Sequence, residues 1–330
     1  MMNECIDIHT HVVPENFPPY AGKGRDVPWP SMADAHACHK HVMISGKVYR
    51  TVSDGCWSVA RRIADMGEMR VTRQAISPMP ELLSYWLPLD DAATLIRYLN
   101  DTIAAMVGEA RERFIGLGAV PLQDIDAATR ELEYCRKLGF AGVEIASHVN
   151  GTSIGDARYE PFFAAAEQMG AAIFVHALRP AGQDRIVGPF SEQAVCFPGD
   201  IGLACASMIT GGIGARHPRL RIAFSHGGGV MSILLARLVH AWNVLPKAKE
   251  ALGESPAVTA RRFYYDELVF DPLAVRHVIA TFGASQIMVG SDYPFALGDP
   301  RPVKTLEAVG LDAATLAAIS SGNAGRFLAL

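Results

Sequence analysis

The chain has 330 residues; half are hydrophobic, 19% are charged, and the formal net charge is −4, with a sequence pI near 6.3. This composition is typical of a globular protein with a large apolar core. It argues against a nucleic-acid partner, because no dense cluster of Lys and Arg is present. It also argues against a membrane span, because no stretch of about 18 uncharged apolar residues occurs.

The cysteines and the first residues bear on the compartment. The six cysteines include no Cys-x-x-Cys pair and follow no regular spacing. The N-terminal segment lacks the basic region and the long apolar core of a signal peptide. We therefore expect reduced thiols and a cytoplasmic protein.

Short β-rich runs alternate with helical segments along the chain, as in parallel βα units. Eight strands are expected, over Cys5–Val12, Val71–Ser77, Phe114–Val120, Gly142–Ser147, Ala172–Ala177, Arg221–Ser225, Phe263–Leu268 and Gln286–Ser291. Helices expected between them include Ala92–Gly108, Ala127–Leu138, Glu160–Met169, Leu203–Thr210, Met231–Trp242 and Pro272–Phe282. No Gly-rich phosphate-binding motif follows the first strand. The pattern predicts an α/β protein with a closed (β/α)8 TIM barrel rather than an open dinucleotide-binding sheet.

The segment 14–57 interrupts this alternation. Four prolines punctuate its first half, and two β-rich runs, His41–Ile44 and Lys47–Val52, then flank Ser45–Gly46. Two such runs around a Ser-Gly pair predict a small β-hairpin. We place it above the barrel mouth as an insertion after the first strand, within one domain that spans residues 1–330.

Two histidines mark the end of the first expected strand. His9 and His11 flank Thr10, and because side chains alternate along a strand, both imidazoles lie on one face, about 7 Å apart. At the C-terminal end of a barrel strand this face points inward at the barrel mouth. Two imidazoles so placed suit two positions of one metal site.

Three more expected strands end in a polar side chain. His176 follows the apolar residues of the fifth strand, His226 follows the sixth and Asp292 follows the eighth. Catalytic groups of TIM barrels converge at these strand ends. We therefore predict a metal site formed by His9, His11, His176 and Asp292.

Three imidazoles and one carboxylate fit Zn²⁺ best, with Mn²⁺, Fe²⁺ and Co²⁺ as alternatives, and no organic cofactor is expected. His226 is left over from this ligand set. An imidazole titrates near neutral pH, so we expect His226 to accept and return a proton as the catalytic acid and base.

These motifs, in this order, resemble the amidohydrolase superfamily, and more narrowly its decarboxylating branch, the 2-amino-3-carboxymuconate-6-semialdehyde decarboxylase family. Further stretches that resemble this branch are Gly46-Lys-Val-Tyr-Arg50, Cys56-Trp57, Ser84-Tyr-Trp86, Ser147-His-Val-Asn150, Ser207-Met208 and Asp292-Tyr-Pro-Phe-Ala-Leu-Gly298. The similarity runs from residue 5 to about residue 328. It implies one divalent zinc ion, His226 as acid and base, Arg50 bound to a substrate carboxylate, and Lys47 nearby.

Two arginines, Arg50 and Arg237, are candidates for binding the substrate. A guanidinium can hold a carboxylate through two hydrogen bonds, and on a hairpin over the barrel mouth Arg50 would reach such a group. Arg237 lies about 12 Å down the helix that follows the sixth strand, among apolar residues. An internal salt bridge is one interpretation of Arg237. The resemblance implies the other, a homodimer in which Arg237 reaches the substrate site of the neighbouring subunit.

Two segments depart from the family pattern, around Leu178–Arg179 and Gln193–Phe197. We expect them to shape the substrate pocket. Structural or solvated positions are expected for the remaining candidate ligands, which are Glu144, His148, His36, His39 and His41.

Taken together, these features predict a zinc-dependent, non-oxidative decarboxylase. Its substrate would be a small unsaturated or aromatic carboxylic acid, most similar to 2-amino-3-carboxymuconate-6-semialdehyde. The first alternative is a metal-dependent hydrolase or hydratase of the same superfamily, which would release no stoichiometric carbon dioxide. The second is a ligand-binding barrel that keeps the metal for stability. His226 argues against it, because structural metal binding does not need that residue.

Overall fold

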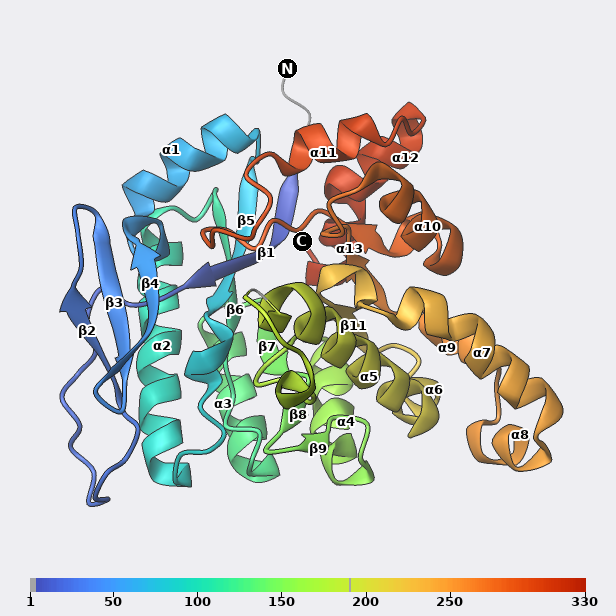
Figure 1. Cartoon of the computed structure of the whole chain (residues 1–330), viewed down its shortest axis with the longest axis horizontal. Helices are drawn as coiled ribbons and strands as arrows, with labels where there is room; N and C mark the ends of the chain where they lie inside the picture. The colour runs from blue at the N-terminus through green and yellow to red at the C-terminus, as the bar shows by residue number, and fades with distance from the viewer. Residues whose placement is uncertain (1–3, 190) are drawn as a thin grey trace.

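A computed structural model of the chain describes residues 4–189 and 191–330, and it is built around a barrel of parallel strands. The eight barrel strands, in their order around the sheet, are β1 (Ile6–Val12), β5 (Arg73–Pro78), β6 (Phe114–Gly118), β7 (Gly142–Ala146), β10 (Ala172–His176), β11 (Arg221–Phe224), β12 (Tyr264–Asp266) and β13 (Ile287–Met288). Each coincides with one of the eight predicted strands. The predicted (β/α)8 barrel is confirmed (Figure 1).

Strand β1 closes the barrel and carries an irregularity. Residue pairs Asp7–Val289 and Thr10–Tyr293 join β1 to the chain at and beyond β13. On its other side β1 pairs with β5, with a register shift between Asp7 and Thr10. Such a local shift re-aims the side chains that follow it, and these irregularities occur next to active sites. His9 falls inside the shifted segment.

Helices cover the barrel from outside. Those that follow barrel strands or extend the chain are α1 (Val59–Met69), α2 (Leu89–Glu109), α3 (Ile125–Lys137), α4 (Glu160–Met169), α5 (Phe197–Thr210), α6 (Ile213–Arg216), α7 (Met231–Val244), α8 (Pro246–Leu252), α9 (Pro256–Ala260), α10 (Pro272–Phe282), α11 (Pro302–Ala308), α12 (Ala313–Ala317) and α13 (Asn323–Leu328). Local signals set several ends. For α10, Asp271 accepts hydrogen bonds from the first-turn amides, Pro272 follows, and the helix ends at Gly283.

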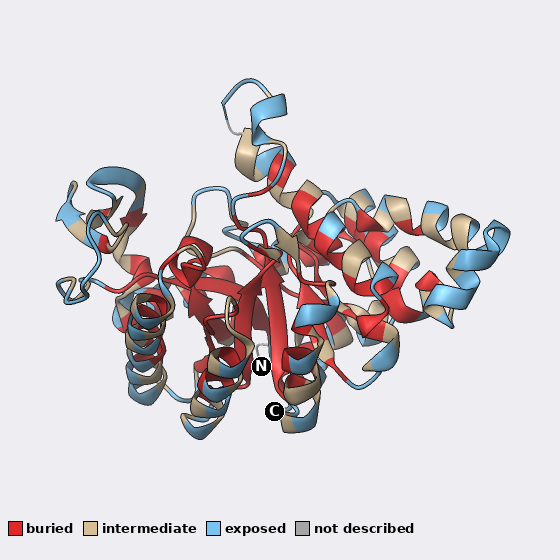
Figure 2. Ribbon diagram, turned by 90° about the horizontal axis from the view of Figure 1, so that it is seen from below, coloured by how far each residue is buried: buried red, intermediate tan, exposed pale blue. Residues whose placement is uncertain are grey.

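The core has an inner and an outer part. Inside the barrel, Ile6, Ile8, Phe174 and Met288 belong to one buried cluster. The other faces of the strands pack against the helices in a larger cluster. Figure 2 shows the strands buried in the middle and the helices exposed on their outer faces. Side chains fill the barrel interior below the mouth.

The sheet in the insertion after β1 has one strand more than predicted. Its antiparallel sheet has three strands in the order β2 (Pro30–Asp34), β3 (His39–Ile44) and β4 (Lys47–Ser53), so the predicted hairpin is β3–β4 and β2 was missed. The prediction took Pro30 as a break, but a proline is tolerated as the first residue of an edge strand. The sheet stands beside α2 at one side of the barrel (Figure 1).

A buried arginine ties α1 to the first strand. Arg62 is fully buried, and its Nη2 donates a hydrogen bond of 2.7 Å to the backbone carbonyl of His11. Its guanidinium also lies 4.9 Å from the centre of the Tyr293 ring. These contacts link the ends of the first and last barrel strands, from which three of the four predicted metal ligands come.

Within the described residues, no single helix is long and apolar enough to cross a membrane. One pair of helical segments, His226–Val244 with Pro246–Ala260, meets the length and composition criteria together, with a bend of 106° between them.

We expect Gly142→Ala to destabilise the barrel. An added Cβ at this position in β7 would lie 1.8 Å from the carbonyl oxygen of Ala172 in the neighbouring strand β10. Overpacking of this kind costs about 1–3 kcal/mol. The free energy of unfolding, measured by denaturant titration, should fall by that amount.

Gly67→Ala is the matched control. Gly67 lies in α1, and its added Cβ would have no neighbour within 4 Å. The same substitution should therefore leave stability unchanged or raise it by up to about 1 kcal/mol through helix propensity. Equal effects at the two glycines would contradict the close approach of β7 and β10.

Candidate metal centre

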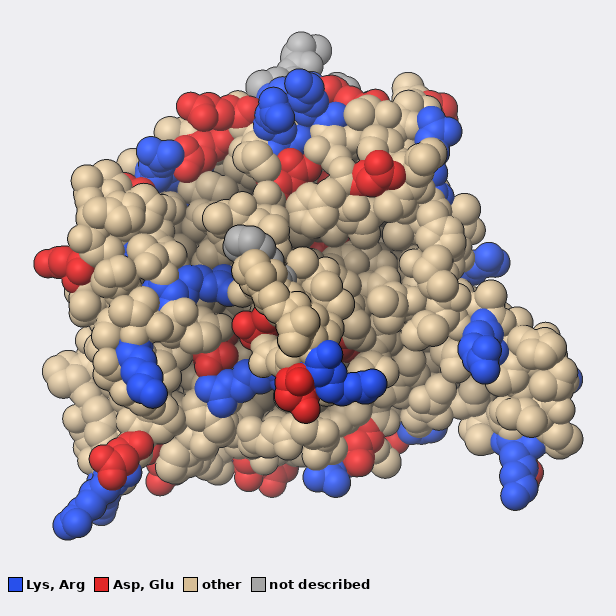
Figure 3. Space-filling model, in the orientation of Figure 1, with Lys and Arg blue, Asp and Glu red and all other residues tan. Residues whose placement is uncertain are grey.

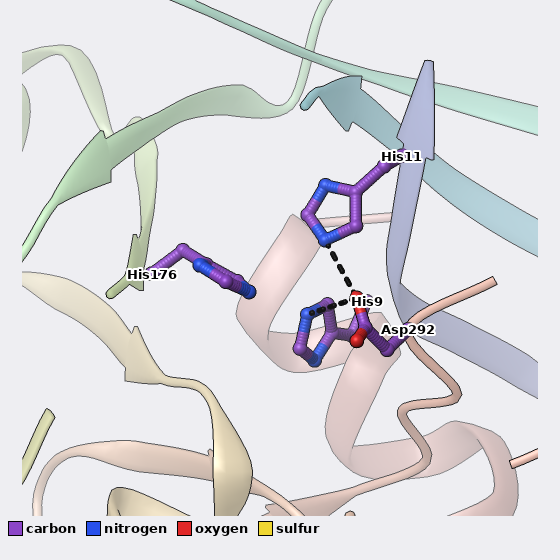
Figure 4. Close-up of side chains that lie close together, drawn as sticks. All are labelled: His9, His11, His176 and Asp292. Carbon is purple, nitrogen blue, oxygen red and sulfur yellow. Dashed lines mark ion pairs between the residues drawn. The ribbon is translucent and has the colours of Figure 1, made fainter. Parts of the chain in front are cut away.

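Four predicted ligands converge at the mouth of the barrel. One ligand atom from each of His9, His11, His176 and Asp292 lies within 4.8 Å of those from the other three. Figure 4 shows His9 and His11 projecting from β1, His176 from the end of β10, and Asp292 from the segment after β13. All three histidines are buried. Residues that are up to 283 positions apart in the sequence thus form one compact group, because the barrel closes between β13 and β1.

Each imidazole is held through its Nδ1 atom. The Nδ1 of His9 is 2.7 Å from Oδ2 of Asp266, that of His11 is 3.3 Å from the carbonyl of Pro78, and that of His176 is 2.8 Å from the carbonyl of Ala177. Carbonyl and carboxylate oxygens accept hydrogen bonds, so each Nδ1 carries the proton. The Nε2 lone pair of each ring is then free to bind a metal.

The ligand atoms that make no hydrogen bond are placed to bind a divalent cation. The Nε2 atoms of all three histidines and Oδ1 of Asp292 are buried and have no hydrogen-bond partner within the part of the chain that the structure describes. Oδ1 of Asp292 lies 3.1 Å from Nε2 of His11 and 3.5 Å from Nε2 of His9. Ligands around a tetrahedral zinc ion lie about 3.3 Å apart, so this spacing suits a shared ion. Four orphaned buried polar atoms that face one point are best explained by a bound metal.

Asp292 is suited to its role as an anionic ligand. Burial would raise the pKa of its carboxyl, but the close imidazoles of His11, His9 and His176 hold this pKa well below its usual range. Its backbone has φ of 59°, in the left-handed region that a non-glycine residue adopts only at a cost. His226 is in the same region, with φ of 54°. Strained backbone of this kind clusters at functional sites.

His226 lies beside the four ligands and outside their group. Its ring centre is 5.2 Å from that of His9 and 5.0 Å from that of His176. Its Nδ1 is 2.9 Å from the hydroxyl of Ser225. Burial lowers the pKa of His226 to about 4, so the ring is neutral at pH 7 and can accept a proton.

A cavity of about 1040 Å³ opens above the metal centre. His176, His226 and Asp292 lie in its floor and Arg50 of the insertion lies in its wall. The segments expected to shape the pocket do so, since the lining includes Leu178, Arg179, Gln193, Ala194 and Phe197. A cavity of this size accommodates a small organic molecule.

Two predicted substrate-binding residues lie elsewhere. Lys47 is exposed next to the Ser45–Gly46 turn, and it is not among the described residues that line the cavity. The turn keeps Lys47 in solvent, so the structure does not bring it to the metal centre. Arg237 is exposed on α7 and also lies outside its own cavity. No internal salt bridge is present for Arg237 within the described residues.

Two of the remaining candidate ligands, Glu144 and His39, lie near this site. Glu144 points into the barrel, where its carboxyl is 2.5 Å from the Ser77 hydroxyl and 3.7 Å from Nδ1 of His11. Burial raises the pKa of Glu144 to about 8, and the residue lies outside the group of four potential ligands. His39, for which a structural or solvated position was expected, is half-buried in the cavity wall and lies outside the group of four ligands.

Sequence reasoning missed Asp266, which supports two parts of the site at once. Its Oδ2 holds His9, and its Oδ1 accepts hydrogen bonds of 2.7 Å from the amide of Gly227 and 3.2 Å from that of Leu268. Asp266 ends β12, so the rule that polar residues at barrel-strand ends face the site would have found it.

Comparisons with known proteins agree with this geometry. The family model described as amidohydrolase matches residues 6–330. The chain belongs to the amidohydrolase family. This amidohydrolase is 35% identical over 328 residues to a 2-amino-3-carboxymuconate-6-semialdehyde decarboxylase of Dictyostelium discoideum, an alignment that covers 98% of this chain and 91% of the relative.

Solved structures extend the comparison. The 5-carboxyvanillate decarboxylase of Sphingomonas paucimobilis is 26% identical, with a TM-score of 0.76, and the match covers 84% of this chain and 85% of that one. The corresponding enzyme of Novosphingobium aromaticivorans, in complex with manganese, is 25% identical, with a TM-score of 0.74 and coverage of 84% and 82%. This amidohydrolase is a metal-dependent enzyme of the decarboxylating branch of its superfamily.

We expect Asp266→Asn to weaken metal binding. The amide cannot accept a hydrogen bond from His9 as strongly as the carboxylate does, and substitution of such supporting residues typically lowers metal affinity about 10–100-fold. Metal content after equilibration with a graded chelator would measure this. Asp156→Asn, at a partly exposed aspartate that pairs with Arg158, is the control and should keep its metal. Equal affinity in the two variants would show that Asp266 does not support the metal centre.

Proposed function

We propose that this protein releases carbon dioxide from a small unsaturated or aromatic carboxylic acid, and that its substrate is 2-amino-3-carboxymuconate-6-semialdehyde or a close analogue. The proposal rests on one observation: a four-ligand metal centre, a neutral imidazole and an unpaired guanidinium face the same cavity. The Dictyostelium relative, named for that substrate, supports the choice of acid. The pocket segments that depart from the family pattern are the reason to include close analogues.

Arg50 binds the substrate carboxylate in this proposal. It lies in the cavity wall and has no hydrogen bond or ion pair within the described residues. Its guanidinium stacks over the Phe295 ring, at 4.4 Å from the ring centre. A stacked, planar guanidinium is pre-oriented to donate two parallel hydrogen bonds to a carboxylate.

His226 moves the proton. Loss of carbon dioxide leaves an electron pair on the carbon that carried the carboxylate, and a proton must replace the departing group. His226 is neutral at pH 7, lies in the cavity floor, and is able to take up a proton and deliver it to that carbon. The contact of its Nδ1 with Ser225 fixes the ring and leaves Nε2 for this exchange.

A divalent cation is the proposed cofactor, with one ion per chain. His9, His11, His176 and Asp292 would hold it, and it would supply a Lewis acid that stabilises negative charge developing on the substrate. We propose zinc because three imidazoles and one carboxylate match its usual ligands. Manganese is the alternative, since it is the ion in the Novosphingobium structure.

A homodimer is also proposed, with Arg237 reaching the site of the partner. The face of α7 around Arg237 carries exposed apolar side chains, including Ile233 and Val244. In Figure 3 the part of the surface over α7 has few charged side chains. Exposed apolar side chains gathered on one surface are typical of an interface, and an unpaired arginine within one is suited to bind an anion across it.

The reaction itself is testable with His226→Ala. The wild-type protein should release carbon dioxide in equal amount to the substrate consumed, whereas the variant should keep its metal and lose about 10²–10⁴-fold in turnover. Asp292→Ala, as the matched ligand variant, should lose the metal as well. Metal analysis and carbon dioxide release would be measured on the same preparations. Substrate loss without carbon dioxide would instead indicate a hydrolase or hydratase, and a metal-free His226→Ala protein would make His226 a ligand.

Complementation tests the position of Arg237. Arg237→Ala and His226→Ala chains should each be inactive alone, and their mixture should regain part of the activity. In a hybrid dimer, one site combines an intact His226 with an intact Arg237 from the other chain. Subunit exchange would be verified with two differently tagged chains. If exchange occurs and activity does not return, Arg237 does not act across an interface.

A further inference from the structure

The loop after β10 brings a second arginine to the cavity. Arg179 lies three residues after the ligand His176, with φ of 45°, in the left-handed region. It lines the cavity above the metal centre and also a second cavity of about 500 Å³ next to it. Arg179 therefore stands in the wall that the two cavities share. A strained conformation at this place needs strong local contacts to maintain it.

Three contacts hold Arg179. Its Nε and Nη2 donate to Oε1 of Glu81 at 3.1 and 2.5 Å. Its guanidinium carbon lies 3.2 Å from the centre of the Trp86 ring. Its backbone carbonyl accepts a hydrogen bond of 3.2 Å from Nε2 of His148, whose Nδ1 accepts one from the amide of Gly151. Side chain and backbone are thus fixed independently.

These contacts leave one edge of the guanidinium free. Glu81 occupies the Nε edge and Trp86 covers one face, yet 48% of the Arg179 side chain remains exposed. A guanidinium has five N–H groups. Among the described residues none accepts a hydrogen bond from Nη1. The free edge accordingly offers oriented donors to whatever occupies the cavity.

The charges of Arg179 and Arg50 are compensated differently. Glu81 is buried, with 5% of its side chain exposed, and its carboxylate neutralises Arg179 at close range. Glu192 also lines the cavity and adds a second negative charge to this wall. Arg50 has no such partner within the described residues. Arg50 therefore binds a substrate carboxylate more strongly than Arg179 does. The free edge of Arg179 favours an acceptor that carries no charge.

We propose that Arg179 is a specificity-determining residue that donates hydrogen bonds from Nη1 to an uncharged oxygen, such as a carbonyl or hydroxyl, on the substrate. This inference rests on the proposed function, because it takes the carboxylate of the substrate to be bound at Arg50. It narrows the substrate class to carboxylic acids with a neutral oxygen acceptor away from the carboxylate. An acid with a second carboxylate at that place would meet the charges of Glu81 and Glu192.

The test is binding, measured by calorimetry on the metal-loaded protein, with non-reacting acids as probes. They are benzoate, its 3-acetyl and 4-acetyl derivatives, and the dicarboxylates isophthalate and terephthalate. At least one acetylbenzoate should bind the wild-type protein about three- to tenfold more tightly than benzoate, the range of a hydrogen bond to a neutral group. In Arg179→Met this preference should vanish while the Kd of benzoate stays the same.

Three further variants separate the possible outcomes. Arg179→Met/Glu81→Gln removes the preference without leaving a buried carboxylate unpaired, and it replaces the single variant if that protein does not fold. Glu81→Gln alone makes Arg179 an uncompensated cation, so a dicarboxylate should gain about five- to tenfold over the matching acetylbenzoate. Arg158→Met, an exposed arginine paired with Asp156, is the control and should bind all probes as the wild type does.

The outcomes that overturn the inference are defined by ratios of Kd. It fails if wild type shows no preference for either acetylbenzoate, or if the preference survives in the Arg179 variants. The inference also fails if Glu81→Gln leaves unchanged the ratio of the Kd of a dicarboxylate to the Kd of the matching acetylbenzoate. Arg50→Gln tests the proposed function separately, because it should weaken all probes about equally. Unchanged benzoate binding in that variant would count against the carboxylate site and not against the role of Arg179.

Discussion

The hydrogen bonds that the three Nδ1 atoms donate are the constraint on which the site depends. A free imidazole ring can present either nitrogen and can rotate, so three histidines near one another do not by themselves form a metal centre. Here an oxygen acceptor fixes the proton on Nδ1 of His9, His11 and His176 and turns each Nε2 toward the same point. Two of these acceptors are backbone carbonyls at strand ends. The barrel backbone itself therefore orients the ligands.

The residues around the mouth of the barrel come from different kinds of structural element. Metal ligands come from strand ends, whereas Arg50 comes from the antiparallel insertion and Arg179 from a loop held by Glu81 and Trp86. This division places the proposed metal chemistry on the strand ends and the proposed selection of the acid on the insertion and the loop. Change in the loops can alter the acid that is accepted without disturbing the floor, as is usual for barrel enzymes.

Much of this arrangement follows from the sequence. All eight barrel strands coincide with predicted ones, and α4 and α10 have the predicted bounds, because Pro and Gly mark their ends. His9 and His11 could be predicted from their alternation on the first strand, and His176 and Asp292 because each follows an apolar run. What the sequence does not reveal depends on contacts between distant segments, such as the register shift in β1, the burial of Arg62 and the pairing of Glu81 with Arg179. Lys47 and β2 show the limit of local patterns, because exposure and edge position are properties of the folded sheet.

Asp266 has a consequence for the evolution of this protein. One carboxylate positions a metal ligand with one oxygen and, with the other, the loop that carries His226. The metal ligands and His226, the proposed proton-transfer group, therefore cannot vary independently. A lineage that replaced His9 by another ligand would release one oxygen of Asp266 and disturb the turn at Gly227, so compensating changes would be needed in both segments. Historical exchange of ligands on the first strand should accordingly be accompanied by substitutions at the ends of the sixth and seventh strands.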